Sequence, residues 1–387
     1  MIYILTILVV LILVFHYDIN GNIYNRMTSY YVLMCWFIFV SAFQYSIGSD
    51  TPPYMYEYDR IQWKDINWSN IFSLSNRQFG WLLLLNLCKL ISHDYVTMKI
   101  IQAVILNLAF FLFFKRRTKA IFTCILFYAI FLYLDFNFNL IRQSFAIAIF
   151  LFGYNYYTDK KWLKYYLVVF GAIMFHNTAA ILLFLPLLQL IHINNKSFAT
   201  IFVLFIISSV VTKTFPLTEY ILGYLSKFGG SDIEFMGNVY LTSEKYGQNN
   251  ITKVISFMTL LYIIVIYFNY KFDLCRSTAD LLVVIAFVFL KDINASIPIF
   301  ARLNFYLMPL FIYLLANFVI NFPIYKFTSF RRSIIVLCIV LFTFSPINDL
   351  FQTNTTYYDK NIVQFYPYYT VFDKQIDPMR AKLFGSF

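Results

Sequence analysis

The sequence has few charged residues and few residues that favour turns. Only 13% of its 387 residues are charged and it contains 11 Gly and 10 Pro, whereas 60% of its residues are apolar and the mean hydropathy is +0.67. A water-soluble domain of this length could not bury so much apolar surface, so the chain is predicted to be an integral membrane protein. Long apolar stretches with few turn residues favour membrane-spanning helices over a β-barrel.

Motifs for disulfides, nucleotides and metals are also missing. The five Cys residues include no Cys-x-x-Cys pair and lie in or beside apolar runs, which argues against a disulfide framework or a zinc site. The chain has neither a P-loop nor a glycine-rich dinucleotide turn. It also lacks the Asp-x-Asp pair that holds a cation in many sugar-nucleotide transferases, because its nearest carboxylates, Glu57 and Asp59, flank Tyr58 in an aromatic segment. We therefore expect no cofactor and no metal.

Twelve apolar runs approach the length of a membrane crossing, which needs roughly 17–25 residues when flanking aromatic residues are counted. They lie at residues 2–17, 27–47, 95–114, 120–135, 139–157, 163–177, 178–194, 198–212, 254–270, 277–290, 303–320 and 333–347. A shorter run, Phe79 to Ser92, contains Lys89 and is predicted to be a re-entrant or interfacial helix. The expected fold is all-α, a single polytopic domain over residues 1–387 with about 12 transmembrane helices.

The charged residues predict how these helices are oriented. Five short segments at alternate gaps hold 13 Lys or Arg and 2 acidic residues, so they should face the cytoplasm; they are 115–119, 159–164, the turn at Lys196, 271–276 and 326–332. Three long polar segments, 48–78, 213–253 and 348–387, hold 11 Lys or Arg and 12 acidic residues and should lie outside. The short segments thus account for the whole net charge of +11, and no nucleic-acid partner is predicted.

This orientation requires that Phe79 to Ser92 does not cross the membrane. A thirteen-span alternative would place the 48–78 segment in the cytoplasm and leave the 348–387 tail outside. The first apolar segment has no basic region before it and no small-residue cleavage site, so it is expected to remain as a span.

Several polar residues fall on the predicted outer face. Arg142 and Arg302 open two spans, His176 lies in the turn between two others, and Asp50, Glu57 and Asp59 lie in the first outer segment. A single Arg near a membrane boundary commonly extends to the interface, and a single His there is commonly a hydrogen-bonded structural residue. Because three such groups gather on one face, we favour a reactive site.

Aromatic residues are abundant, with 32 Tyr and 46 Phe. Most should pack in the core or form interfacial belts. Two outer clusters, residues 53–63 and 366–372, could instead stack against sugar rings through side chains such as Tyr366 and Tyr368, although a solvated tail with no binding role is the alternative for the second cluster.

Four strings in order carry a family resemblance. They are SIGSDTPPYMYEYDRI (46–61), FNLIRQSFAIAIFLFGYNYY (138–157), AIMFHNTAAILLFLPLL (172–188) and FYPYYTVF (365–372). The chain resembles the EpsG family of Wzy-type bacterial polysaccharide polymerases from about residue 28 to 372. That family's Gly-x-Asp with a following Tyr corresponds to Gly48, Asp50 and Tyr54, its Asn-x-x-Arg-Gln helix start to Asn139, Arg142 and Gln143, and its Phe-His to Phe175 and His176. One departure is that Arg77, Gln78, Phe79 and Gly80 stand where many members carry Glu-Pro-Gly.

The resemblance implies a metal-independent glycosyltransferase of the bacterial cytoplasmic membrane, with its active site on the outer face. It would join undecaprenyl-pyrophosphate-linked oligosaccharide repeat units, within the bilayer and beside the flippase and chain-length regulator of the same pathway. Arg142 and Arg302 are candidates to hold the diphosphate leaving group, because a guanidinium group binds phosphate through paired hydrogen bonds. His176 is the favoured base for the acceptor hydroxyl, with Asp50 and Glu57 as carboxylate options. Further expected substrate contacts are Gly48, Thr51, Tyr54, Asn139, Gln143, Tyr366 and Tyr368.

Other functions remain open at this point. A flippase or transporter of lipid-linked sugars would also be polytopic, but it should carry ionisable residues near the bilayer midplane, and here Asp135 and Asp280 lie close to helix ends. A lipid-linked glycan ligase or a membrane acyltransferase is chemically closer, and its donor substrate would distinguish it.

Overall fold

The computed structural model describes residues 2–66, 77–214, 257–294, 300–321, 328–354, 359–378 and 380. Nearly all of the predicted outer segment 213–253 lies outside these ranges. The chain divides into two compact units, Met1–Ala179 with Leu315–Phe387, and Ala180–Leu314. Each is considered by itself.

Each of the twelve predicted ranges contains helix. In the first unit these helices are α1 (Ile2–Leu13) with its π-helical extension η1 (Val14–Ile19), α2 (Arg26–Ala42), α5 (Val96–Arg117), α6 (Ile121–Phe131), α7 (Ile141–Thr158), α8 (Trp162–Ile173) and α17 (Thr328–Phe351). In the second they are the 3₁₀-helix η5 (Asn177–Phe184), which begins in the first unit, with α9 (Leu185–Leu188), then α10 (Asn195–Thr214), α14 (Phe257–Lys271), α15 (Thr278–Asn294) and α16 (Phe300–Asn321), whose residues from Leu315 onward belong to the first unit.

By length and composition, four helices of the described chain could span a membrane. They comprise Ile2–Ile19, Val96–Arg117, Ala301–Asn321 and Phe330–Phe351. The other apolar helices are shorter, so membrane association and the all-helical fold are supported whereas the count of twelve crossings stays a prediction.

Helices of the first unit pack against one another in successive pairs. α2 lies against α5, α5 against α7, α7 against α8, and α6 against both α1 and α17. α7 and α8 pack tightly at Gly153, where an added Cβ would lie 2.5 Å from the Val168 methyl groups. A small residue at such a contact is how membrane helices come close enough to pack well.

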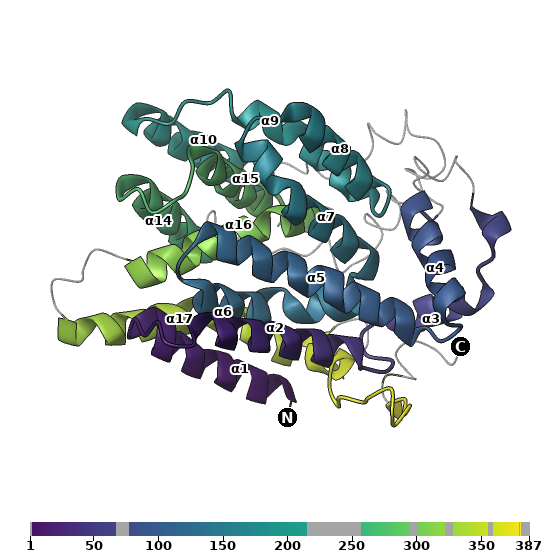
Figure 1. Cartoon of the computed structure of the whole chain (residues 1–387). Helices are drawn as coiled ribbons and strands as arrows, with labels where there is room; N and C mark the ends of the chain where they lie inside the picture. Colours follow the sequence, from purple (N-terminus) through teal and green to yellow (C-terminus); the bar gives the residue numbers. More distant parts are fainter. Residues whose placement is uncertain are drawn as a thin grey trace. The chain divides into compact units, whose positions relative to one another are not determined.

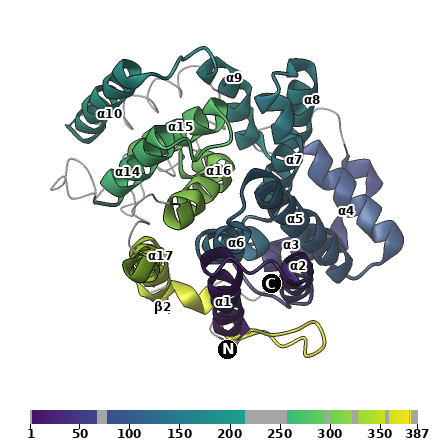
Figure 2. The ribbon, with the colours of Figure 1, turned by 60° about the vertical axis from the view of Figure 1, so that its left-hand side comes forward.

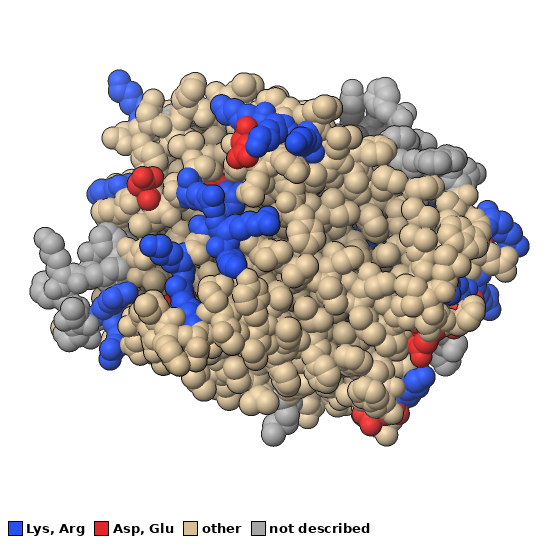
Figure 3. Space-filling view, in the orientation of Figure 1, with Lys and Arg blue, Asp and Glu red and all other residues tan. Residues whose placement is uncertain are grey.

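One end of this unit, which we name the basic end, holds the Lys- and Arg-rich turns. α5 finishes there with Lys115, Arg116 and Arg117, and Arg117 Nη2 donates to Asn155 Oδ1 near the end of α7 at 2.5 Å. In Figure 3 the surface over the middle of α1, α2 and α5 is largely uncharged. Lys and Arg gather at the end of α5 that leads into α6. The side of the membrane on which this end lies stays a prediction made from the sequence.

Asp18 joins three segments at the basic end. It accepts hydrogen bonds from the backbone N and Oγ1 of Thr123, at 2.8 and 2.9 Å, and pairs with Arg26 at 2.8 Å. The buried carboxylate thus satisfies the first turn of α6 while neutralising its charge against Arg26.

The opposite end, which we name the motif end, carries short elements between the long helices. They are α3 (Thr51–Arg60), the 3₁₀-helix η2 (Trp63–Asp65), α4 (Phe79–Ile91), the π-helical turn η4 (Asp135–Asn139), strands β1 (Thr353–Asn354) and β2 (Asp359–Lys360), and the 3₁₀-helix η7 (Asn361–Gln364). Figures 1 and 2 show α4 running across the direction of α5 instead of alongside it. That placement suits the interfacial helix predicted for Phe79 to Ser92.

Backbone contacts at the motif end also bear on the membrane topology. Tyr45 N donates to Tyr369 O at 3.0 Å, and Gly48 N donates to Gln364 O at 2.9 Å. The start of the predicted first outer segment therefore lies on the same side as the tail. The thirteen-span alternative would separate these two segments by the membrane, so the contacts favour the model in which α4 does not cross.

The second unit is a smaller helical cluster in which α15 packs against α14, α10 and α9. Two buried carboxylates are hydrogen-bonded inside it: Asp280 accepts from Tyr313 Oη at 2.7 Å, and Asp292 accepts from Ser209 Oγ at 2.5 Å. A cavity of about 970 Å³ lies between α10 and α14, and its lining is apolar apart from residues such as Asn195 and Lys271. It offers space for hydrocarbon but few groups for chemistry.

Thiol labelling in intact cells tests the topology. In a variant without the native Cys residues, Tyr56→Cys and Phe372→Cys are expected to react with a membrane-impermeant reagent, because both positions are exposed at the motif end. Lys119→Cys and Lys161→Cys, exposed at the basic end, should react only after permeabilisation. Reaction of Lys119→Cys with protection of Tyr56→Cys would invert the orientation, and protection of Tyr56→Cys alone would show that α4 crosses.

Candidate functional site

The first motif forms a tight turn against the start of α7. Gly48 has a φ of +83°, and a Cβ there would collide with the Phe138 carbonyl and the Asn139 side chain. The next residue, Ser49, donates its backbone N–H to Asn139 Oδ1 at 2.8 Å. Thr51 Oγ1 donates to Ile47 O at 2.6 Å and closes the turn. Gly48 is thus required by both its backbone angle and the lack of space.

Asn139 also connects this turn to the C-terminal tail. Its Nδ2 donates to Gln364 Oε1 at 3.2 Å and to Asp135 Oδ1 at 3.3 Å. Three segments distant in sequence therefore meet on one amide. The observed role of Asn139 is structural, and its predicted contact with substrate stays a prediction.

The two predicted tail tyrosines differ in exposure. Tyr368 Oη donates to Val40 O at 2.9 Å and its ring packs edge-on against Tyr3, so its hydroxyl is used within the fold. Tyr366 is 52% exposed. Its surface is the one available for a sugar.

Arg142 lies in the first turn of α7, three residues after Asn139, and its guanidinium group is held by hydrogen bonds. Its Nε donates to Tyr54 Oη at 2.8 Å and its Nη1 donates to Gln78 Oε1 at 2.7 Å. Both acceptors are neutral, and among the described residues no carboxylate forms an ion pair with it. The guanidinium group is thus fixed in orientation while its charge is left for another anion.

A second arginine flanks the same tyrosine ring. Arg77 Cζ lies 5.4 Å from the centre of the Tyr54 ring, and Arg142 Cζ lies 5.8 Å from it. Arg77 pairs with Glu57 at 3.0 Å, and Trp81 Nε1 donates to the other Glu57 oxygen at 3.4 Å. Burial raises the pKa of Tyr54, and the nearby Arg142 charge opposes part of that rise. The Tyr54 hydroxyl therefore stays protonated near neutral pH.

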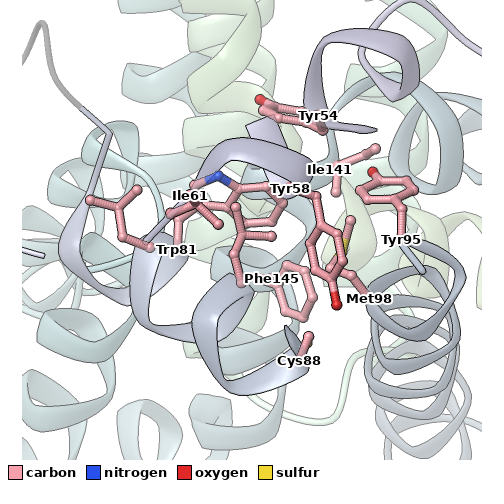
Figure 4. Packing of buried hydrophobic residues seen from close by; sticks show 11 residues of the cluster. Tyr54, Tyr58, Ile61, Trp81, Cys88, Tyr95, Met98, Ile141 and Phe145 are labelled. Carbon is pink, nitrogen blue, oxygen red and sulfur yellow. The ribbon is translucent and has the colours of Figure 1, made fainter. Parts of the chain in front are cut away.

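A hydrophobic cluster beneath Tyr54 holds these groups in place. Figure 4 shows Trp81 of α4 and Ile141 and Phe145 of α7 packed around residues of α3 and α5. Ile141, directly before Arg142, is fully buried, and so is Trp81. Rigid packing on both sides restricts the movement of the start of α7, which is what a binding group for a charged ligand requires.

His176 lies where α8 ends, beside the start of α4. Gly80 N donates to Met174 O at 2.8 Å, and Phe175 stacks on Phe145 with ring centres 5.4 Å apart. The imidazole is 8% exposed, with Nδ1 at 2.7 Å from Thr178 Oγ1. Nδ1 also accepts a hydrogen bond from the Thr178 backbone N at 3.3 Å, so Thr178 contacts this nitrogen through both its backbone and its side chain.

The remaining predicted residues take different positions. Asp50 is half-buried and immediately precedes α3, and Gln143 is buried in α7. Arg302 is exposed in the first turn of α16, in the second unit, so its proposed pairing with Arg142 stays a prediction.

Several site residues were not singled out from the sequence. Three of them, Arg77, Gln78 and Trp81, lie around Arg142 and Tyr54. The fourth is Lys99, which is 1% exposed and donates to Gln102 Oε1 at 2.5 Å and to the Asn137 carbonyl of η4 at 2.6 Å. The sequence offered one signal for Gln78, which is its departure from the family's Glu-Pro-Gly. Gln78 lies two residues before Gly80, at the position that the Glu would occupy. A neutral amide occupies that place, and it accepts the Arg142 hydrogen bond.

The comparison with protein families agrees with this geometry. The model of the EpsG family matches residues 27–370, a range that includes the first three motif strings and residues 365–370 of the fourth. The chain belongs to the EpsG family. Membership indicates a membrane protein of polysaccharide biosynthesis with polymerase activity of the glycosyltransferase kind. Searches among curated proteins and among solved structures gave no match.

Two glycines test whether the crowded turn matters to this EpsG-family fold. Gly48→Ala is expected to lower the melting temperature and the folded yield in detergent, because the strain of a positive φ, roughly 1 kcal/mol, adds to a steric clash of roughly 1–3 kcal/mol. Gly21→Ala is the matched control, since Gly21 has a φ of +73° but open space around its Cβ position. Equal effects of the two substitutions would contradict the packing role of Gly48.

Proposed function

We propose that this protein polymerises undecaprenyl-pyrophosphate-linked oligosaccharide repeat units into a surface polysaccharide, on the outer face of the bacterial cytoplasmic membrane. The acceptor hydroxyl oxygen forms a bond to the anomeric carbon of the donor sugar. The bond from that carbon to the phosphate oxygen breaks, and undecaprenyl pyrophosphate leaves. The donor is already activated, so the reaction needs neither a nucleotide nor a divalent cation.

The observation that carries this proposal is the environment of Arg142. Two neutral acceptors, Tyr54 and Gln78, orient the guanidinium group, and no described carboxylate neutralises it. Charge develops on the diphosphate as the glycosidic bond breaks, and a preorganised cation stabilises that charge. Arg77 lies across the same Tyr54 ring and adds positive potential, although Glu57 balances part of it.

His176 supports the second half of the reaction. A general base must accept the proton of the acceptor hydroxyl, and an imidazole can do this near neutral pH. The Thr178 hydroxyl contacts Nδ1 at 2.7 Å. The Thr178 backbone N–H also donates to Nδ1 at 3.3 Å, so Nδ1 is the ring nitrogen that this contact holds as a hydrogen-bond acceptor. Asp50 is the next candidate, because Glu57 is occupied by Arg77 and Trp81.

A transporter of the same substrates is less well supported. Lys99, the buried cation of α5, lies in the first turn of its helix and binds the η4 backbone. Asp280 lies in the first turn of α15 and accepts from Tyr313. Neither is placed midway along a broken helix, as a transport site usually requires.

Polymerisation by the purified protein tests the proposal. Wild-type protein in nanodiscs, given lipid-linked repeat units that accumulate in cells lacking this chain, should form a ladder of longer glycans on a gel in the presence of chelator. Arg142→Lys keeps the charge but cannot reach Tyr54 and Gln78 together, so the rate should fall on the order of 10²-fold.

The matched control is Arg116→Lys, an exposed arginine at the basic end, which should leave the rate unchanged. Failure of wild-type protein to extend the glycan would refute the polymerase assignment. Full loss of product in chelator, restored by one metal, would transfer the leaving-group role to a cation. A fully active Arg142→Lys variant would remove Arg142 from that role.

The base assignment has its own test. His176→Gln keeps a hydrogen-bonding side chain but cannot accept a proton, so turnover should fall by about 10²–10⁴-fold while lipid-linked substrate still binds. We also expect the wild-type rate to decline toward acidic pH, because a protonated imidazole is no base, and the residual rate of the variant to lack that decline. His93→Gln, exposed at the same end, is the control. Wild-type polymer length from His176→Gln would make Asp50 the next residue to test.

A further inference from the structure

A polar cavity lies within the first unit, near Arg142 but lined by other residues. It has a volume of about 280 Å³ and is enclosed by the end of α6, the η4 turn, α17 and η7. α17 packs beside α6 along this wall (Figure 2). Small-molecule sites commonly occupy roughly 300–1,000 Å³, so this cavity is suited to one ring and not to a whole repeat unit.

Polar side chains from three elements line the cavity. Asp135 and Asn139 come from η4, Asp349 comes from α17, and Asn361 and Gln364 come from η7. Among the described residues of the lining there is no Lys or Arg, and the lining also includes Phe131 and Phe365. The cavity therefore presents carboxylate and amide groups next to aromatic carbon, which is the combination that binds hydroxyl groups and the apolar face of a sugar ring.

The amide groups are already oriented by the fold. Asn361 Nδ2 donates to the Asp349 carbonyl at 2.8 Å, and Asn139 Nδ2 is shared between Asp135 and Gln364. The Asp135 carboxylate accepts only the 3.3 Å bond from Asn139 among the described residues. A carboxylate has about four acceptor positions, so Asp135 can take further hydrogen bonds from a ligand.

We propose that this cavity binds one uncharged or amino sugar ring of the glycan substrate. An acidic sugar is disfavoured, because Asp135 and Asp349 would repel its carboxylate and no lining cation would offset that repulsion. Asn139 connects the cavity to the reacting centre, since it lies three residues before Arg142. A glycan with its reacting sugar near Arg142 can place a neighbouring ring in the cavity. This inference rests on the proposed function for the identity of its ligand.

Binding of the free glycan tests the cavity without requiring catalysis. The probe is the repeat-unit oligosaccharide released by mild acid from the lipid-linked units that accumulate in cells lacking this chain. Calorimetry should detect its binding to wild-type protein in nanodiscs containing chelator. Leu350→Trp places a larger side chain at the cavity wall and should weaken binding at least about 10-fold. The matched control is Phe344→Trp, on the same helix but outside the lining and 67% exposed, which should bind as wild type does.

A milder variant guards against misfolding. Asp135→Asn keeps the oxygen that accepts from Asn139 but removes the charge, and it should weaken binding about 10-fold because hydrogen bonds to a charged group are worth roughly 1.5–3 kcal/mol. Melting temperatures of the variants should stay close to that of wild type. Unchanged affinity in both Leu350→Trp and Asp135→Asn, or wild-type binding that is lost in chelator, would overturn the sugar site.

The two proposals fail in different ways. If wild-type protein forms polymer and the cavity variants bind and extend glycan normally, the sugar site is wrong and the polymerase assignment stands. If wild-type protein forms no polymer but binds the free oligosaccharide in a way that Leu350→Trp abolishes, the polymerase assignment is wrong and the cavity is still a glycan site.

Discussion

The Asn139 amide is the contact on which the motif end depends. Its oxygen accepts from Ser49, and its nitrogen donates to Asp135 and Gln364. Through these bonds it joins the first polar segment, the turn before α7 and the tail. Arg142 follows one turn later, so its direction is set by a junction that lies outside the regular part of α7. An exchange at Asn139 would remove these side-chain bonds among the three segments and leave backbone bonds, such as Gly48 N to Gln364 O, between the first segment and the tail.

Irregular backbone beside the junction needs its own hydrogen-bonding partners. The η4 turn departs from α-helical geometry, and carbonyl groups left unpaired in an apolar region carry a large free-energy cost. Lys99 donates to the Asn137 carbonyl, and Gln102 Nε2 donates to the Phe136 carbonyl at 2.9 Å. The presence of two buried polar residues, Lys99 and Gln102, in the first half of α5 is explained by this requirement. They allow the chain to turn sharply next to Arg142 without exposing its backbone.

The proposed chemistry and the glycan cavity use different properties of the same junction. Arg142 extends toward α3 and α4, where Tyr54 and Gln78 are neutral and leave its charge available. Asp135 lies on the other side of η4, where the cavity lining is acidic and amide-rich. Positive charge for a diphosphate and acceptors for hydroxyl groups are thus separated by a few residues of backbone. A lipid-linked glycan carries these two chemical groups in the same molecule.

The sequence by itself determined the class of this protein and the positions of its helices. Hydropathy is a local property, so each predicted apolar range contains helix, and the alternation of charge identified the basic end. The motif strings were sufficient to identify the EpsG family, which the family comparison confirmed. Only the tertiary structure decided which residues meet, because Asn139 and Gln364 are 225 positions apart and no local pattern joins them. It likewise gave Gln78 and Lys99 their partners, since a lone polar residue in an apolar helix acquires a role only from the segment that packs against it.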